Sequence, residues 1–235
     1  MDEPDIKPSR LARSLRFIRF INAVLGYRRV ILRHLDWFGA NWQSGQPITI
    51  IDLATGSADI PRAILRWADR RGLDVSVVGV DRHPVTAGIA ARLSRDPRLT
   101  IAEADVSDLP FAPGSFDYPT SSMFLHHLDD ADIVRTLRTM DALARRGIIV
   151  SDLLRHRRAY LWIKLLTLPC PRMLRHDACV LVAQSLDKAQ VMKARQDAGL
   201  AYTRYCRDSG HRWALAGEKS GMSALRVERG GIGLQ

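Results

Sequence analysis

Between residues 48 and 153, short apolar runs alternate with stretches of helical periodicity. The apolar runs are Ile48–Leu53, Val75–Val80, Leu99–Ala102, Phe116–Ser121 and Gly147–Leu153. The helical stretches are 59–71, 84–93 and 130–146. Strands that alternate with helices form βαβ units, in which parallel strands make one sheet and helices cover both of its faces. The alternation therefore predicts an α/β fold, a Rossmann-like doubly wound sheet whose strands are mostly parallel.

The chain on either side of this alternation adds helices and two last strands. We expect helical segments at residues 1–46, where Gly26 separates two basic amphipathic helices. Such helices can bind a membrane surface, but packing on the sheet domain is the favoured interpretation. The domain itself should span 47–217, with a helical insertion at 155–186 and a helix that starts at Asp187 and ends at Gly199. Final strands at 201–207 and 211–217 bring the sheet to seven strands, and 218–235 should form a flexible tail.

Charge and cysteine content narrow the functional classes. The 35 basic and 25 acidic residues give a net charge of +10, and a basic surface can bind nucleic acid. The arginines are spread along nearly the whole chain, however, without an aromatic–basic cluster, so a nucleic-acid substrate is not expected. Three cysteines without C-x-x-C spacing fit a reducing cytoplasm. The most apolar run, Tyr160–Leu168, is shorter than the roughly 20 residues of a membrane span.

Acidic and small residues stand where the predicted strands end. Asp52 ends the first strand and is followed by the small-residue turn ATGSA, which lets a ligand approach the backbone closely. Asp81 ends the second strand, where a carboxylate can accept both hydroxyls of a ribose. Asp105 follows the third strand and can face an adenine amino group. Since the carboxyl ends of parallel strands share one edge of a sheet, these groups predict a ligand site there.

These motifs, together with FDYPTSSMFLHHL at the fourth strand, resemble the class I S-adenosylmethionine-dependent methyltransferases of the small-molecule type. The resemblance covers residues 48–152. It implies S-adenosyl-L-methionine as the cofactor, S-adenosyl-L-homocysteine as its product, and a lid and acceptor pocket built from residues 1–46 and the insertion. It also implies a set of cofactor-binding residues, namely Asp52, Ala54, Thr55, Gly56, Ala58, Asp81, Arg82, Asp105, Val106, Ser121 and Ser122.

The chain departs from the family pattern at several positions. Ala54 and Ala58 replace the first and third glycines of the family's Gly-x-Gly-x-Gly loop, while Gly56 keeps the central one. Alanine is still small, so we expect cofactor binding to survive. Tyr118 is bulkier than the usual aliphatic residue. Pro119 removes a hydrogen-bond donor from a central strand, which predicts either a bulge or a loss of stability.

Two histidines are the candidate catalytic residues. His126 and His127 follow the fourth strand, where an acceptor would approach the methyl group. A histidine with a pKa of about 6.5 can remove a proton from a phenol or hydroxyl near neutral pH; alternatively, one caps the next helix and the other packs. We interpret Asp129 and Asp130 as helix-cap and first-turn charges, and no metal site is expected. Asp152 ends the fifth strand and either faces the pocket or caps the strand end.

The sequence therefore predicts methyl transfer to a small-molecule acceptor, with O-methylation of a phenolic or hydroxyl group as the first hypothesis. C-methylation of a quinone or polyketide ring is the second, and a catalytically impaired methyltransferase-like binding protein is the third. A nicotinamide-dependent oxidoreductase is disfavoured because Gly56 is the single glycine of the turn after Asp52. An RNA methyltransferase is suggested by charge alone. The Arg175–Asp177 triplet of the insertion either contacts the acceptor or pins the lid, and the oligomeric state stays open.

Overall fold

The computed structural model describes residues 26–156, 163–164, 180, 182–208 and 211–219. The expected first helix at 9–25, most of the insertion with its Arg175–Asp177 triplet, and the tail beyond residue 219 lie outside the described residues.

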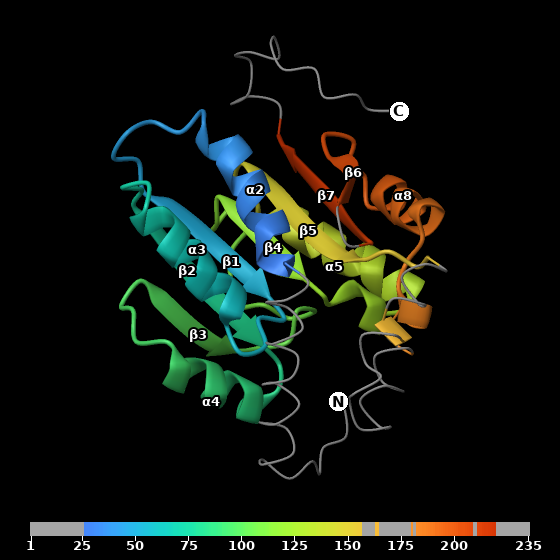
Figure 1. Ribbon diagram of the computed structural model, residues 1–235, viewed down its shortest axis with the longest axis horizontal. Coiled ribbons are helices and arrows are strands. Elements are labelled where there is room, and N and C mark those ends of the chain that lie inside the picture. Colours follow the sequence, from blue (N-terminus) through green and yellow to red (C-terminus); the bar gives the residue numbers. More distant parts are fainter. Residues whose placement is uncertain (1–25, 157–162, 165–179, 181, 209–210, 220–235) are drawn as a thin grey trace.

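One mixed sheet of seven strands forms the centre of the fold, in the order β3-β2-β1-β4-β5-β7-β6 (Figure 1). The strands from β3 to β5 in this order pair in parallel, and β7 runs antiparallel to both β5 and β6. The predicted doubly wound, mostly parallel sheet is confirmed. The strand bounds are β1 (Ile48–Leu53), β2 (Val75–Asp81), β3 (Leu99–Glu103), β4 (Tyr118–Ser122), β5 (Gly147–Leu153), β6 (Arg204–Asp208) and β7 (Arg212–Glu218).

Helices cover both faces of the sheet because neighbouring strand residues point to opposite sides. Ile50 packs into the core with α2, α3 and α4, whereas Ile51 packs into the core with α5 and α8. The helix bounds are α2 (Tyr27–Gly39), α3 (Asp59–Asp69), α4 (Pro84–Leu93), α5 (Asp130–Leu143) and α8 (Lys188–Asp197), with a short 3-10 helix, η1 (Leu125–His127). Residues 104–117, which join β3 to β4, contain no helix.

Side-chain caps start two of these helices where the sequence predicts them. The Asp129 carboxylate accepts the Asp132 backbone N–H at 2.7 Å at the start of α5. Asp187 caps α8, and Gln190 completes a capping box with it. α2 ends at Gly39, short of the predicted Trp42, because Trp42 turns back to the sheet and its indole Nε1 donates to the Tyr118 hydroxyl at 2.9 Å.

Pro119 does not make β4 bulge, so the bulge expected as one outcome is absent. The register with β1 runs without interruption, pairing Pro119 with Ile51. Since the Asp117 N–H donates to the Thr49 carbonyl at 2.8 Å, the Ile51 carbonyl would take its bond from residue 119, which has no N–H. The Thr120 hydroxyl lies 3.3 Å from that carbonyl oxygen and donates to it. A side chain thus replaces the missing ladder donor.

Tyr118 uses its bulk to connect three parts of the fold. Its ring stacks on Phe38 of α2 at 5.4 Å and on Trp42 at 5.5 Å, measured between ring centroids. Its hydroxyl donates to the Glu218 carboxylate at the end of β7 at 2.5 Å. Burial, followed by the bond to Glu218, raises the pKa of Tyr118. The departure from an aliphatic residue therefore fastens α2 and β7 to the centre of the sheet.

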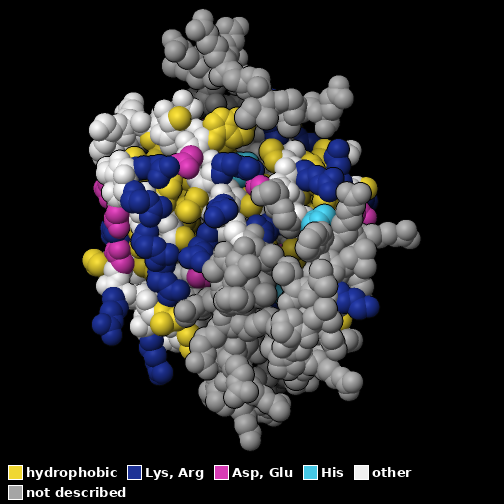
Figure 2. All heavy atoms as spheres, viewed as in Figure 1, with side chains coloured by type: hydrophobic (Ala, Val, Ile, Leu, Met, Phe, Trp, Pro, Cys, Tyr) yellow, Lys and Arg dark blue, Asp and Glu magenta, His cyan; other side chains and the backbone are white. Residues whose placement is uncertain are grey.

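Basic side chains are numerous on one face of the molecule (Figure 2). Figure 2 shows Lys and Arg side chains over the face that α2 and α3 cover, with acidic and hydrophobic side chains between them. Among the described residues, no helix has both the length and the apolar character that crossing a membrane requires.

Candidate cofactor and acceptor site

Asp52 is a buried carboxyl group beneath the turn that follows β1. It is 2% exposed and accepts hydrogen bonds from the hydroxyls of Thr55 and Thr120, each at 2.8 Å. Burial raises the pKa of Asp52 to about 7, although both hydroxyls oppose the shift. These contacts suit Asp52 to shaping the turn from below.

The turn after β1 takes a backbone conformation that normally requires glycine. The φ angles are 55° at Ala54, 57° at Gly56 and 56° at Ala58, all in the left-handed region. For a residue with a Cβ this conformation costs about 1–2 kcal/mol. The two alanines therefore keep the loop shape that glycines favour, at an energetic cost. Space above the loop is open, since a Cβ added at Gly56 would meet no atom within 4 Å.

Asp81 joins this turn to the loop after β2. Its carboxylate accepts the Gly56 N–H at 2.9 Å and the His83 N–H at 3.0 Å, one on each oxygen. Each carboxylate oxygen has two lone pairs, so both retain room for a hydroxyl donor. Burial raises the pKa of Asp81. Arg82, beside it, is exposed.

The loop after β3 presents one polar and one apolar candidate. Asp105 is exposed and accepts from the backbone N–H and the hydroxyl of Ser107, at 2.8 and 2.7 Å. These bonds lower the pKa of Asp105. Val106, the next residue, is 9% exposed and belongs to the core beside α5. Both residues follow the strand that lies next to β2 in the sheet.

At the end of β4 the two candidate serines differ. Ser121 is buried and its hydroxyl donates to the Leu53 carbonyl at 3.3 Å. The Ser122 hydroxyl is a buried group without a hydrogen-bond partner among the described residues, as is that of Ser151, its direct neighbour on β5. Ser151 was not among the predicted residues. Unsatisfied buried hydroxyls are uncommon in folded proteins, and two adjacent ones mark this strand pair.

The structure separates the two candidate histidines. His126 is buried, and its Nδ1 lies 2.7 Å from an Asp152 oxygen while its backbone N–H donates to the other oxygen at 3.2 Å. Its Nε2 is buried and has no hydrogen-bond partner among the described residues. Burial lowers the pKa of His126, but the Asp152 carboxylate outweighs it and the net shift is upward. His127 is exposed, with its ring centroid 4.2 Å from that of His126.

Asp152 therefore contacts the candidate base His126, and it also accepts backbone N–H groups as a strand-end cap would. It also accepts the Leu153 N–H at 2.7 Å. Its contact with His126 joins residues 26 positions apart, so strand-end position was the sole sequence signal. Among the residues that the structure describes, no group of three or more His, Cys, Asp or Glu side chains could hold a metal ion.

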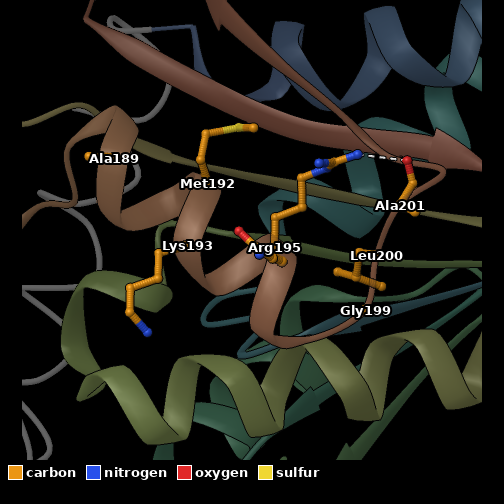
Figure 3. Close-up of a pocket in the computed structure, with 8 residues that line it drawn as sticks. Ala189, Met192, Lys193, Arg195, Gly199, Leu200 and Ala201 are labelled. Atoms are coloured by element: carbon orange, nitrogen blue, oxygen red, sulfur yellow. Dashed lines mark hydrogen bonds between the residues drawn. The ribbon is translucent and has the colours of Figure 1, made fainter.

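A separate hollow lies away from these strand ends. It has a volume of about 480 Å³ and is lined by α8 and the turn that follows it (Figure 3). Arg195 crosses it and donates to the Ala201 carbonyl at 2.6 Å. Ala201 precedes β6, whose first residue pairs with Ala216 near the end of β7, beside the amino end of β5. The end of the hollow at Ala201 thus lies at the opposite edge of the sheet from Asp81 and His126.

A known protein family matches the central part of the chain. Residues 50–147 match the family model described as a methyltransferase domain. Residues 50–147 therefore form a methyltransferase domain. The match spans β1 to the start of β5 and so contains every predicted site residue. Nothing among curated protein sequences matches the chain.

Solved methyltransferases share the fold at low sequence identity. A magnesium protoporphyrin IX methyltransferase from Synechocystis with bound S-adenosylhomocysteine is 15% identical, with a TM-score of 0.61 over 89% of this chain and 93% of that one. A methyltransferase from Aquifex aeolicus is 11% identical, with a TM-score of 0.59 over 91% and 99%. Human N-acetylserotonin methyltransferase is 13% identical, with a TM-score of 0.63 over 91% and 56%. At these identities the likeness concerns the fold.

Proposed function

We propose that this methyltransferase uses S-adenosyl-L-methionine to methylate a hydroxyl or phenol of a small-molecule acceptor, with His126 as the general base. The buried His126–Asp152 pair at the end of β4 is the observation that carries the proposal. A carboxylate on Nδ1 orients the imidazole and leaves Nε2 as the proton acceptor. It also stabilises the imidazolium that forms when the proton arrives.

The residues around the first two strand ends fit the cofactor. The open space above Gly56 admits a ligand close to the backbone, and the Asp81 oxygens have lone pairs left for ribose hydroxyls. We assign Asp52, Thr55, Ala54 and Ala58 to shaping this loop, and Arg82, Asp105 and Val106 to the adenine side. Ser121 and Ser122 belong to the methyl end. When bound, S-adenosyl-L-methionine supplies an electrophilic methyl group on its sulfonium.

The protein's own part in the reaction is to hold the acceptor and take its proton. His126 removes the hydroxyl proton, and Asp152 balances the resulting positive charge. The buried surroundings of this pair keep water away from the reacting oxygen and increase the effect of correct positioning. His127 is exposed and has no assigned step.

Isothermal titration with S-adenosylmethionine and S-adenosylhomocysteine tests the cofactor assignment. We expect micromolar binding by the wild type and its loss in Asp81→Ala. A folded wild-type protein that binds neither compound at millimolar concentration would refute the proposed function. Binding without methyl transfer to any phenol, alcohol or quinol of an acceptor panel would identify an impaired methyltransferase-like binding protein, and transfer to ring carbon would replace O-methylation by C-methylation.

Two matched variants test the base. We expect His126→Gln to lower kcat about 10²–10⁴-fold, the usual contribution of general-base catalysis, with unchanged S-adenosylhomocysteine affinity. His127→Gln should stay within a few-fold of the wild type. Asp152→Asn should shift the acid limb of the kcat/KM profile to lower pH, because the carboxylate raises the pKa of His126. Equal effects of the two histidine substitutions would exclude this assignment.

A further inference from the structure

Several buried polar groups without partners gather on one face of the sheet, beside the carboxyl ends of β4 and β5. They are Nε and Nη2 of Arg212 and the hydroxyls of Ser122 and Ser151. Arg212 as a whole is 2% exposed. Among the described residues, no oxygen accepts a hydrogen bond from these two guanidinium nitrogens. Leaving a buried charged donor unsatisfied costs more free energy than leaving a neutral one unsatisfied, so this arrangement calls for a ligand.

Strand register places the three residues together. Ser122 pairs with Ser151, and Leu153, two residues further along β5, pairs with Arg212 of β7. Since side chains alternate along a strand, Ser122, Ser151 and Arg212 point to the face that α2 covers. Ser151 and Arg212 are diagonal neighbours on adjacent strands, roughly 7–8 Å apart, and Ser122 lies one strand further away. We call these three residues, with Tyr27 of α2, the Arg212 patch.

Tyr27 fixes the orientation of the guanidinium. Cζ of Arg212 lies 3.9 Å from the centroid of the Tyr27 ring, a cation–π contact. Asp208, which is opposite Arg212 on β6, forms an ion pair with Arg33 at 2.5 Å. The nitrogens left over, Nε and Nη2, form one edge of the planar fork. An edge of this kind donates two parallel N–H bonds to a single oxyanion.

We infer that the Arg212 patch binds a carboxylate of the acceptor, so that the substrate is a hydroxy acid. The inference rests on the proposed function and names its substrate class. Arg212 supplies a two-point bond to the carboxylate, and the serine hydroxyls supply further donors beside the end of β4. Asp152 points to the opposite face of the sheet from Ser151 and Arg212, so the acceptor hydroxyl must reach His126 over the strand ends. The cofactor's own carboxylate is a poorer occupant. β7 is separated from β1 by two strands, which at about 4.8 Å a step puts Arg212 roughly 14 Å from the β1 turn.

Matched acceptors test this inference with the full chain. The three isomeric hydroxybenzoates are compared with the corresponding hydroxybenzamides and hydroxyphenyl phosphates, by titration into protein saturated with S-adenosylhomocysteine and by release of S-adenosylhomocysteine from S-adenosylmethionine. We expect at least tenfold preference for one carboxylate over its amide. A preference for the phosphate ester would mean that the Arg212 patch binds a phosphate group of the acceptor and not a carboxylate. The inference is overturned if the acid and the amide bind and react equally well, or if neither of them binds.

Variants then assign the preference to Arg212. Arg212→Gln should abolish it through KM, and Arg212→Lys should restore part of it, because lysine keeps the charge without the fork. Arg204→Gln, an exposed arginine on the neighbouring strand, should change nothing. S-adenosylhomocysteine affinity should be the same in all variants, and its loss in Arg212→Gln alone would assign the residue to the cofactor instead. If Arg212→Gln does not fold, the comparison of acid with amide in the wild type still decides whether the protein selects a carboxylate on its acceptor. Failure of the wild type to bind any cofactor refutes the proposed function itself.

Discussion

Replacing Ala54 by glycine should stabilise this protein, contrary to the usual effect of introducing glycine. Ala54 has a φ of 55° and is partly exposed. Glycine adopts the left-handed region without the steric cost that the Cβ of alanine causes, so the substitution would relieve about 1–2 kcal/mol. Glycine also increases the conformational freedom of the unfolded chain, which offsets about 0.4–1 kcal/mol of this stabilisation. We therefore expect the free energy of unfolding to rise by about 0.5–1 kcal/mol, or the Tm by about 1–4 °C for a chain of this size.

Two further substitutions make the reasoning specific. Ala58 has the same φ but is 0% exposed, so Ala58→Gly also loses about 0.8 kcal/mol of methyl burial and should be close to neutral. Ala91→Gly, at an exposed position inside α4, should cost about 1 kcal/mol. Urea unfolding of all three variants gives the comparison. If Ala54→Gly is as destabilising as Ala91→Gly, backbone strain in the loop is refuted.

Three other predictions concern buried positions in and beside the sheet. Arg146→Met should cost about 3–5 kcal/mol in urea unfolding, because Arg146 contacts Asp117 at 3.0 Å and both side chains are buried; a loss below about 1 kcal/mol would contradict this. Gly79→Ala should destabilise by about 1–3 kcal/mol and weaken S-adenosylhomocysteine binding in titration, since its Cβ would lie 2.9 Å from the Thr55 hydroxyl; an unchanged Tm and affinity would exclude the close contact. Burial raises the pKa of Asp52 from 3.8 to about 7, so the folded state binds the carboxyl proton of Asp52 more tightly than the unfolded state does. The free energy of unfolding should therefore fall as the pH rises from about 4 to 7, and then level off. Urea unfolding at several pH values should show a smaller fall in Asp52→Asn, and an identical fall in both proteins would contradict the shift.

Local sequence signals were sufficient for the architecture. Apolar runs and helical periodicity predicted the parallel sheet, and the caps Asp129 and Asp187 predicted two helix starts, because these features depend on neighbouring residues. The candidate cofactor residues could also be proposed from the sequence, because they directly follow the apolar runs that predict the strands. Element bounds moved by a few residues where ladder bonding or a long-range contact decided them, as at Trp42.

Features that depend on strand register could not be predicted from the sequence. The pairing of His126 with Asp152, and the alignment of Ser122, Ser151 and Arg212, require knowing which strands are adjacent and which residues face each other. The replacement of a proline's missing donor by Thr120 is likewise a contact across strands. Periodicity assigns a residue to a face but does not name its neighbour there.

The insertion of β7 between β5 and β6 has a consequence for biosynthesis. β7 comes last of the seven strands along the chain, yet it closes the hydrogen-bonding edge of β5, and its Glu218 accepts the bond from Tyr118. While the chain is still on the ribosome, β5 therefore presents an open edge with apolar side chains, which is prone to mispairing. Arg212 also reaches its place beside Tyr27 only at this late stage. Nascent chains that stall before residue 212 should accordingly be both inactive and dependent on chaperones.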